Sequence, residues 1–371
     1  MLYIGIMSGT SLDGIDVALV DFSNESPQLI QSLLRPFPPL LREQLSLLSQ
    51  PGDNEMERMG LVEAELAIAY ASAVAELLTA SQLTAYDIIG IGCHGQTIRH
   101  RPQAQHPFTY QIGDMHRLAA LTGIRVIADF RRKDVAYGGQ GAPLVPAFHQ
   151  AVFAHPSRGR CILNIGGIAN LTILVPHQPI QGFDTGPGNC LLDNWIFKCQ
   201  GNSFDANGDF AKSGQLQPLL LGQLLSDPYF QINGPKSTGR EYFQLAWLEQ
   251  QLTRLDTQNL QPADIQRTLS RFSAGTMALA ISRFVVDEVF VCGGGARNQQ
   301  LMLDLTELLP NCRISTTDEL GVHPDWVEAM AFAWLAYAFD AGIPGNVPAV
   351  TGASRALVLG VEYWNIVFNR H

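Results

Sequence analysis

Two segments of the chain combine glycine with polar residues in a way that could hold phosphate. GTSLDGID occupies residues 9–16 and GGIAN occupies residues 166–170, and each lies between two short apolar runs. Such runs around Gly and Ser or Thr predict β-hairpins. Their turns can present several backbone N–H groups and hydroxyls to an anion. An ordinary hairpin turn uses the same residues, but the repetition favours two related halves, each with a phosphate loop, and a nucleotide held between two domains.

The first loop carries groups beyond its glycines. Thr10 and Ser11 have hydroxyl donors, and Asp13 or Asp16 could reach a water bound to a metal ion. The chain contains no GxxxxGK[ST], so this loop is not a Walker A motif.

The segment FDTGPGN at 183–189 contains the favoured catalytic group, Asp184. Pro187 fits the first turn of a helix, which would put Gly186 near the N-cap. Asp184 would then precede the positive end of that helix and stay ionised. There it could accept a proton from a nucleophile held against the γ-phosphate. A turn stabilised by the Asp side chain would explain the same residues without catalysis.

Two further segments follow predicted strands. HGQT at 94–97 comes after the apolar run 87–93, and open α/β sheets place ligands at strand ends, so its side chains suit a polyhydroxylated ligand. For His94 alone, a structural role is the preferred interpretation. GGGARN at 293–298 follows another strand, and its glycines would let a ring or ribose lie against the backbone. A wide strand-to-helix turn is the alternative there, and the absence of GxGxxG disfavours a dinucleotide fold.

Other candidate residues have equally ordinary explanations. The basic run at 131–133 fits a solvated turn as well as a substrate contact. Asp325 and Glu328 have the spacing of a helix capping box. GGQGAP at 138–143 could be a domain hinge or a substrate loop, and the residues do not decide between them.

The elements that must position these groups alternate between strand and helix, which predicts an α/β fold. With 371 residues, the chain exceeds the size at which one core stops growing, so two domains are expected. The best candidate boundary is the Gly/Pro-rich stretch at 137–146, and residues 202–245 are interpreted as an irregular or mobile insertion. The predicted helices span 55–80, 113–123 with Gly123 as its end, 187–200, 262–284, 299–309 and 324–339.

Composition excludes several partners. A net charge of −10 disfavours nucleic acid and anionic membrane surfaces as the main partner. No run approaches the ~18 apolar residues needed to span a bilayer, and the N-terminus is expected to be a strand rather than a signal peptide. The six cysteines form no CxxC pair, which is typical of reduced core residues in a cytoplasmic protein.

Together, the motifs resemble one enzyme family. IGIMSGTSLDGIDVALVDF, GCHGQTIRH, ADFRRKDVAYGGQGAPLVP, LNIGGIANLT, FDTGPGN and VCGGGARN look like anhydro-N-acetylmuramic acid kinase, and they span residues 4 to about 298. The wider order of motifs resembles the superfamily of actin, hexokinase and the heat-shock chaperone ATPases. That resemblance implies a two-domain actin-like ATPase fold (ribonuclease H-like) with duplicated mixed-sheet domains and a cleft between them. The expected domains are 1–135, completed by the C-terminal segment 355–371, and 136–354.

The resemblance also implies a reaction. ATP and Mg2+ would be used to open 1,6-anhydro-N-acetylmuramic acid, a product of cell-wall turnover, with water at its anomeric carbon and to phosphorylate the 6-oxygen. Asp184 would activate the water, and Thr97, Arg131 and Glu328 are the expected sugar contacts. The metal ligands stay unassigned, and a homodimer is left open. The expected nucleotide contacts are Gly9, Thr10, Ser11, Leu12, Asp13, Gly14, Ile15, Asp16, Asn164, Gly166, Gly167, Gly293, Gly294, Gly295 and Asn298.

Two alternatives remain at this point. A different small-molecule kinase or phosphatase on the same fold would keep the phosphate loops and lose the muramyl contacts. A nucleotide-gated regulatory protein would use ATP to drive domain motion for a protein partner, and it would more often carry an additional peptide- or DNA-binding domain.

Overall fold

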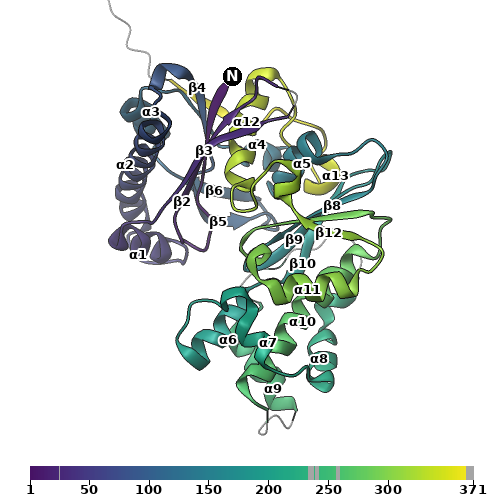
Figure 1. Ribbon diagram of the computed structural model, residues 1–371. Helices are drawn as coiled ribbons and strands as arrows, with labels where there is room; N and C mark the ends of the chain where they lie inside the picture. The colour runs from purple at the N-terminus through teal and green to yellow at the C-terminus, as the bar shows by residue number, and fades with distance from the viewer. Residues whose placement is uncertain (25, 233–237, 239–241, 256–259, 365–371) are drawn as a thin grey trace, which may run out of the picture. The chain divides into compact units, whose positions relative to one another are not determined.

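The chain divides into two compact units (Figure 1). The computed structural model describes every residue except 25, 233–237, 239–241, 256–259 and 365–371. Unit 1 comprises Met1–Val152 and Trp326–His371, and unit 2 comprises Phe153–Asp325.

The boundaries between the units differ from those predicted. Residues 136–152 and 326–354, which we expected in the second domain, belong to unit 1. Inside unit 1, the ring of Phe148 packs against Trp334 with centroids 6.2 Å apart, and Gln140 N–H donates to the carbonyl of Thr351. The Gly/Pro-rich stretch at 137–146 is therefore an internal loop of unit 1 and not a boundary.

Unit 1 is built on a mixed six-stranded sheet in the order β13-β7-β4-β1-β2-β3. The first three strands in sequence pair antiparallel, β4 and β7 continue parallel to β1, and β13 pairs antiparallel with β7, so the C-terminal segment completes this sheet. A separate hairpin joins β5 (Gln96–Arg101) and β6 (Phe108–Ile112). The strands of the main sheet are β1 (Leu2–Met7), β2 (Ile15–Asp21), β3 (Gln28–Arg35), β4 (Ile88–Cys93), β7 (Val126–Ala128) and β13 (Val361–Tyr363).

Unit 2 repeats this arrangement with a five-stranded sheet in the order β10-β9-β8-β11-β12. Here too, the first three strands pair antiparallel and the last two run parallel to the first. The order and directions match β3-β2-β1-β4-β7 of unit 1, which confirms the prediction of duplicated mixed sheets. The strands are β8 (Arg160–Ile165), β9 (Ile168–Leu174), β10 (Gln181–Pro187), β11 (Glu288–Cys292) and β12 (Arg313–Thr316).

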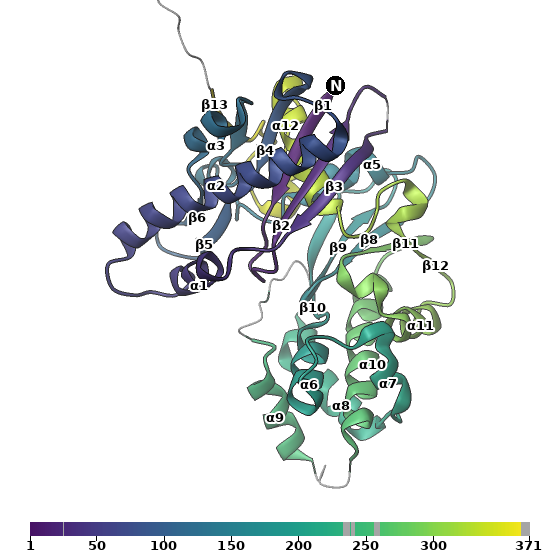
Figure 2. The ribbon, with the colours of Figure 1, turned by 60° about the vertical axis from the view of Figure 1, so that its left-hand side comes forward.

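Helices cover both faces of the unit 1 sheet (Figure 2). Side chains alternate along β1, so Ile4 and Ile6 join the core that contains Leu66 of α2 (Glu55–Ser81). Gly5 points the other way, where α12 (Val327–Ala341) lies directly against the strand. The other helices of this unit are α1 (Pro39–Leu48), α3 (Met115–Thr122), α4 (Arg132–Ala136), α5 (Val145–Phe153) and α13 (Pro348–Thr351).

In unit 2 the sheet packs on the long helix α10 (Pro262–Ile281) and on α11 (Gln299–Leu308). Further helices gather around the other end of α10, as Figure 1 shows. These helices are α6 (Cys190–Gln200), α7 (Asp209–Ser213), α8 (Pro218–Leu225) and α9 (Leu245–Arg254).

The interpretation of 202–245 as irregular was wrong for its described residues. The segment contains α7, α8 and short 3-10 turns at Ala206–Gly208 and Pro228–Gln231. Several of its apolar residues, including Leu224 and Phe243, are buried in a cluster with α6 and α10. The burial of these few side chains outweighs the polar composition that suggested an insertion.

Two expectations about composition can be compared with the structure. Among the described residues, no helix has both the length and the apolar character needed to cross a membrane. All six cysteines are free thiols; four are buried, whereas Cys199 is exposed and Cys312 is half-buried.

Candidate functional site

The first phosphate loop joins β1 and β2, as the sequence predicted. Leu12 N–H donates to the carbonyl of Gly9 at 3.2 Å and closes a turn. A Cβ on Gly14 would lie 2.6 Å from Leu34, so packing requires that glycine, whereas a Cβ on Gly9 would contact only Ser11. Thr10 and Asp13 are exposed, Ser11 and Asp16 are half-buried, and Leu12 and Ile15 are buried. Any contact of Leu12 or Ile15 with a nucleotide would therefore use the backbone.

The turn after β4 is bonded to this loop. Strands β1 and β4 run parallel as neighbours, so their carboxyl ends meet. Gln96 donates from Nε2 to the carbonyl of Gly9 at 3.2 Å, and the hydroxyl of Ser8 donates to the carbonyl of Gly95 at 3.3 Å. Thr97 follows on β5, half-buried, and its hydroxyl accepts from Gln111 at 3.0 Å. Ser8 was not among the predicted residues, whereas Gln96 belongs to the HGQT motif, whose side chains we expected to suit a polyhydroxylated ligand.

Arg131 is not in a solvated turn. Its Nε donates to Nε2 of His94 at 3.0 Å, and its Nη1 donates to the carbonyl of Gly141 at 2.8 Å. Burial lowers the pKa of the guanidinium to about 10, and the nearby Glu328 opposes that shift. Arg131 therefore remains charged at neutral pH.

Glu328 does not cap the helix that contains it. Helix α12 begins at Val327 with Trp326 at the N-cap, and no side chain caps it. Asp325, the expected cap, instead pairs with Arg297. Burial raises the pKa of the Glu328 carboxyl, and the positive charge of Arg131 opposes the rise. The structure thus brings two of the three predicted sugar contacts together, and the capping interpretation was wrong.

Asp184 lies within a strand rather than before a helix. Strand β10 continues through Pro187, which pairs with Ile168, and α6 begins only at Cys190 with Asn189 at its N-cap. Because β10 is an edge strand, it tolerates a proline. The predicted stabilisation of the carboxylate by a helix end was therefore wrong.

The surroundings of Asp184 disfavour its ionised form, whereas a helix end would have stabilised it. Burial raises the pKa of its carboxyl to about 6, partly opposed by the N–H of Thr238, which donates to Oδ2 at 3.0 Å. The hydroxyl of Tyr229 donates to the backbone carbonyl of Asp184 at 2.9 Å. A carboxylate with such a pKa is a stronger base than an exposed one and is still ionised at neutral pH. The sequence offered no motif for Tyr229 or Thr238, since both lie in the segment interpreted as irregular.

The glycine segments of unit 2 converge at the ends of β8, β10 and β11. Asn189 donates its backbone N–H to the carbonyl of Gly166 at 2.9 Å and its side-chain amide to the carbonyl of Ile165 at 3.2 Å. A Cβ on Gly293 would lie 2.4 Å from Oδ1 of Asn164, and one on Gly295 would lie 2.2 Å from Ile165. Packing between the two turns therefore requires both of these glycines.

Gly294 differs from its two neighbours. A Cβ there would meet only Nδ2 of Asn189, at 3.9 Å, and Gly294 is exposed. Gly166 is similar, because its nearest contact would be the carbonyl of Ile168 at 3.4 Å. Neither glycine is required by the fold, so both are free to lie against a ligand.

We therefore expect Gly294→Ala to raise the KM for ATP several-fold without lowering stability. Its backbone φ lies outside the left-handed region, so alanine fits, and the added methyl projects only into the space expected for the nucleotide. ATP-dependent kinetics and urea unfolding of this variant check the prediction. Gly295→Ala is the control, since it should destabilise the protein by overpacking. An unchanged KM in Gly294→Ala would remove this position from the nucleotide site.

Asn298 has a structural role that the sequence did not reveal. It is buried, and Oδ1 accepts the N–H of Leu301 at 3.1 Å, which caps α11. The side chain expected at the nucleotide therefore stabilises the helix that follows GGGARN.

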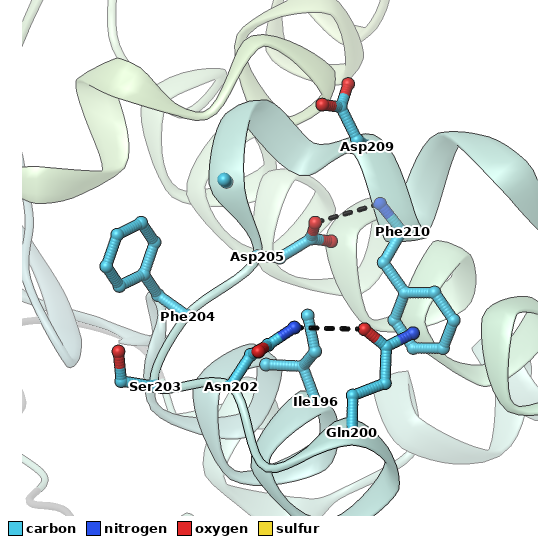
Figure 3. Close-up of a pocket in the computed structure, with 9 residues that line it drawn as sticks. Ile196, Gln200, Asn202, Ser203, Phe204, Asp205, Asp209 and Phe210 are labelled. Atoms are coloured by element: carbon cyan, nitrogen blue, oxygen red, sulfur yellow. Dashed lines mark hydrogen bonds between the residues drawn. The ribbon is translucent and has the colours of Figure 1, made fainter.

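A pocket of about 420 Å³ opens elsewhere in unit 2, next to the end of α6 and the start of α7 (Figure 3). Asp205 lies in it, but its carboxylate already accepts the N–H groups of Phe210 and Ala211 and the amide of Gln266. These hydrogen bonds give the Asp205 carboxylate a structural function. No predicted site residue lines the pocket.

Comparison with known proteins gives consistent matches along the chain. The family model described as anhydro-N-acetylmuramic acid kinase matches residues 1–365. The chain is 48% identical over 366 residues to the anhydro-N-acetylmuramic acid kinase of Pasteurella multocida, covering 98% of this chain and 97% of that protein. It is 52% identical over 363 residues to the enzyme of the same name from Shewanella oneidensis, covering 97% and 98%.

Solved structures are more distant. The activator of the 2-hydroxyisocaproyl-CoA dehydratase from Clostridium difficile with bound ADPNP has a TM-score of 0.47 at 13% identity, covering 92% of this chain and 95% of that chain. A ROK family glucokinase from Streptomyces griseus in complex with glucose and AMPPNP has a TM-score of 0.41 at 14% identity, covering 90% and 99%.

Proposed function

The chain belongs to the anhydro-N-acetylmuramic acid kinase family, and we propose that Asp184 is the general base of its reaction. The enzyme uses ATP and water to convert 1,6-anhydro-N-acetylmuramic acid into N-acetylmuramic acid 6-phosphate and ADP. The observation that supports Asp184 is its partly buried carboxylate on β10, whose pKa of about 6 lies close to the operating pH of a cytoplasmic base.

Ring opening and phosphoryl transfer together require one proton acceptor, Asp184. The oxygen of a water forms a bond to the anomeric carbon, and the bond from that carbon to O6 breaks. The electron pair goes to O6, which forms the new bond to the γ-phosphorus as the bond to ADP breaks. The proton of the water passes to Asp184. Because Oδ2 is held by the Thr238 N–H, we assign the proton to Oδ1.

The phosphates of ATP are assigned to the Gly9–Asp16 loop and to the turn at 166–167, and the rest of the nucleotide to Gly294. Mg2+, when bound, would neutralise the phosphate charge that develops during transfer. Mg2+ prefers phosphate oxygens, waters and one or two carboxylates, and the exposed carboxylate of Asp13 fits that donor set. Asp13 would contribute by holding a metal-bound water.

The sugar is assigned to the turn of unit 1 that carries Thr97, with Arg131 and Glu328. A charged guanidinium and a carboxyl in one partly buried cluster can donate to and accept from sugar hydroxyls and an N-acetyl group. Both residues are half-buried and neither is exposed, which favours this role over that of a surface ion pair.

Three further expectations stay predictions. These are a homodimer, a cytoplasmic location and a second domain that carries both the catalytic base and part of the nucleotide site.

The defining experiment measures ADP release from Mg-ATP with and without 1,6-anhydro-N-acetylmuramic acid, with mass detection of the sugar product. We expect ADP release that depends on the sugar and a product heavier by one water and one phosphoryl group. A phosphorylated product that retains the anhydro ring would show transfer without hydrolysis and would overturn the proposed water activation by Asp184. ATP binding without turnover of this sugar would indicate that the enzyme phosphorylates a different small-molecule acceptor.

A further inference from the structure

We infer that His94 is a positioning residue that holds the guanidinium of Arg131 in the orientation in which it contacts the sugar. This inference rests on the proposed role of Arg131 as a sugar contact. It assigns a function to a side chain for which the sequence favoured a structural role.

The geometry leaves Arg131 little freedom. Nε donates to Nε2 of His94 at 3.0 Å, and Nη1 donates to the carbonyl of Gly141 at 2.8 Å. His94 is 5% exposed, and its ring packs against Phe332 of α12 with centroids 4.8 Å apart. Two edges of the planar guanidinium are thus fixed by groups that are themselves immobile.

His94 can accept this hydrogen bond only as a neutral ring. A protonated imidazole has donors on both nitrogens and could not accept from an arginine. Burial and the charge of Arg131 hold the pKa of His94 well below its usual range, although backbone groups of Gly95 and Ser8 oppose the shift. The neutral ring therefore persists through the physiological pH range, with its proton on Nδ1.

A second layer holds Gly141 in place. The carboxylate of Asp134 is fully buried; Oδ2 accepts the N–H of Gly141 at 2.8 Å, and Oδ1 accepts from Asn346 at 2.7 Å and Thr351 at 2.8 Å. The loop that the sequence left open as a hinge or a substrate loop is thereby fixed within unit 1. Its role, in this inference, is to supply the carbonyl that holds Arg131.

This arrangement would improve sugar binding through preorganisation. A free arginine side chain loses considerable rotamer entropy when it is ordered on a ligand. Here Nε and Nη1 are occupied by the protein before the ligand arrives, so Nη2 can donate to a sugar oxygen with little further ordering.

The test compares substitutions that keep or remove the acceptor at the position of Nε2. Gln places an amide oxygen near that position, whereas the shorter Asn does not reach it and Leu has no acceptor. We expect His94→Leu and His94→Asn to raise the sugar KM about tenfold, with the KM for ATP unchanged. His94→Gln should recover most of the lost affinity. The pair of Asn and Gln variants keeps the test valid if the Leu variant folds poorly.

His149 provides a matched control. It is also a buried histidine of unit 1, at 3% exposure, but it lies on α5 and was not assigned to the site. His149→Leu should change stability and leave both KM values unchanged. A sugar KM that rises equally in His149→Leu and His94→Leu would mean that His94 acts only through stability, which would overturn the inference.

Arg131→Ala separates the two levels of the proposal. If Arg131→Ala leaves the sugar KM unchanged, the proposed sugar contact itself fails. If Arg131→Ala raises the sugar KM and His94→Asn does not, only the positioning role of His94 fails. In the double variant we expect no further loss beyond that of Arg131→Ala, since His94 acts through Arg131.

Discussion

Replacing Asp184 with Asn should lower kcat by about 10²–10⁴-fold, the usual contribution of a general base. Asn has nearly the same volume as Asp but cannot accept the proton of the attacking water. The hydrogen bond from the Tyr229 hydroxyl to the backbone carbonyl of residue 184 does not depend on the carboxylate and should remain. Steady-state measurements of sugar phosphorylation would give the change in kcat, and nucleotide titration should show ATP affinity within about twofold of the original enzyme.

The pH profile of the unmodified enzyme offers an independent check on the same residue. Because the ionised carboxylate is the base, log kcat/KM should fall with falling pH once the pH is below about 6, the raised pKa of Asp184 in the free enzyme. The effect of Asp184 on the free energy of unfolding has the opposite pH dependence. A carboxyl whose pKa is higher in the folded state than in the unfolded one favours folding when protonated, and this contribution is lost as pH rises toward 6. At pH 8, Asp184→Asn should therefore unfold at the same or a higher denaturant concentration than the unmodified protein.

Two results would contradict this account. Substantial turnover by Asp184→Asn would show that another group accepts the proton. An inactive but strongly destabilised Asp184→Asn would mean that the side chain is structural, since the buried charge predicts no loss of stability on its removal.

Replacing Gly5 with Ala should destabilise the protein by about 1–3 kcal/mol or more, the usual cost of overpacking a core. A Cβ on Gly5 would lie 1.8 Å from the backbone oxygen of Ala329 and 2.6 Å from the backbone nitrogen of Ala333. Both atoms belong to the backbone of α12, so no side-chain rotation can relieve the contact. Gly92 on the neighbouring strand makes the same approach to the carbonyl of Phe332, at 1.9 Å. These two glycines let the helix lie directly on the sheet.

Gly60→Ala is the matched control for this substitution. Gly60 lies on the exposed surface of α2, and a Cβ there would meet nothing within 4 Å. Alanine should stabilise this helix by about 0.5–1 kcal/mol, because it restricts the unfolded chain and suits the helix better. Urea unfolding of both variants would test the pair. An unchanged unfolding midpoint in Gly5→Ala would mean that α12 is less closely packed against β1 than the structure shows.

Much of the fold could be predicted from the sequence because the elements have strong local signals. The apolar runs on either side of Gly9–Asp16 and Gly166–Asn170 give the two hairpins, and helical spacing gives α2, α10 and α11 to within a few residues. The repeated hairpin also indicated the duplication of the sheet, which the matching strand orders confirm. The motifs identified the family as well, because glycines and polar residues at strand ends are local features of the chain.

Tertiary structure decided what those residues touch. Composition around Pro187 suggested a helix start, yet pairing with β9 extends the strand past it and places Asp184 among groups that raise its pKa. The spacing of Asp325 and Glu328 matched a capping box, yet Glu328 shares its surroundings with Arg131, 197 residues earlier in the chain.

The hydrogen bonds that orient the two proposed functional residues, Asp184 and Arg131, join residues far apart in sequence. The Tyr229 hydroxyl meets the carbonyl of Asp184 across 45 residues, and Asp134 meets Thr351 across 217. The sequence by itself determined most strands of the two sheets, six of the thirteen α-helices among the described residues, the glycine turns and the family. Only the tertiary structure decided which carboxyls are desolvated and which side chains hold Arg131 and Asp184, because charge and hydrogen bonding in a protein depend on neighbours that local spacing does not specify.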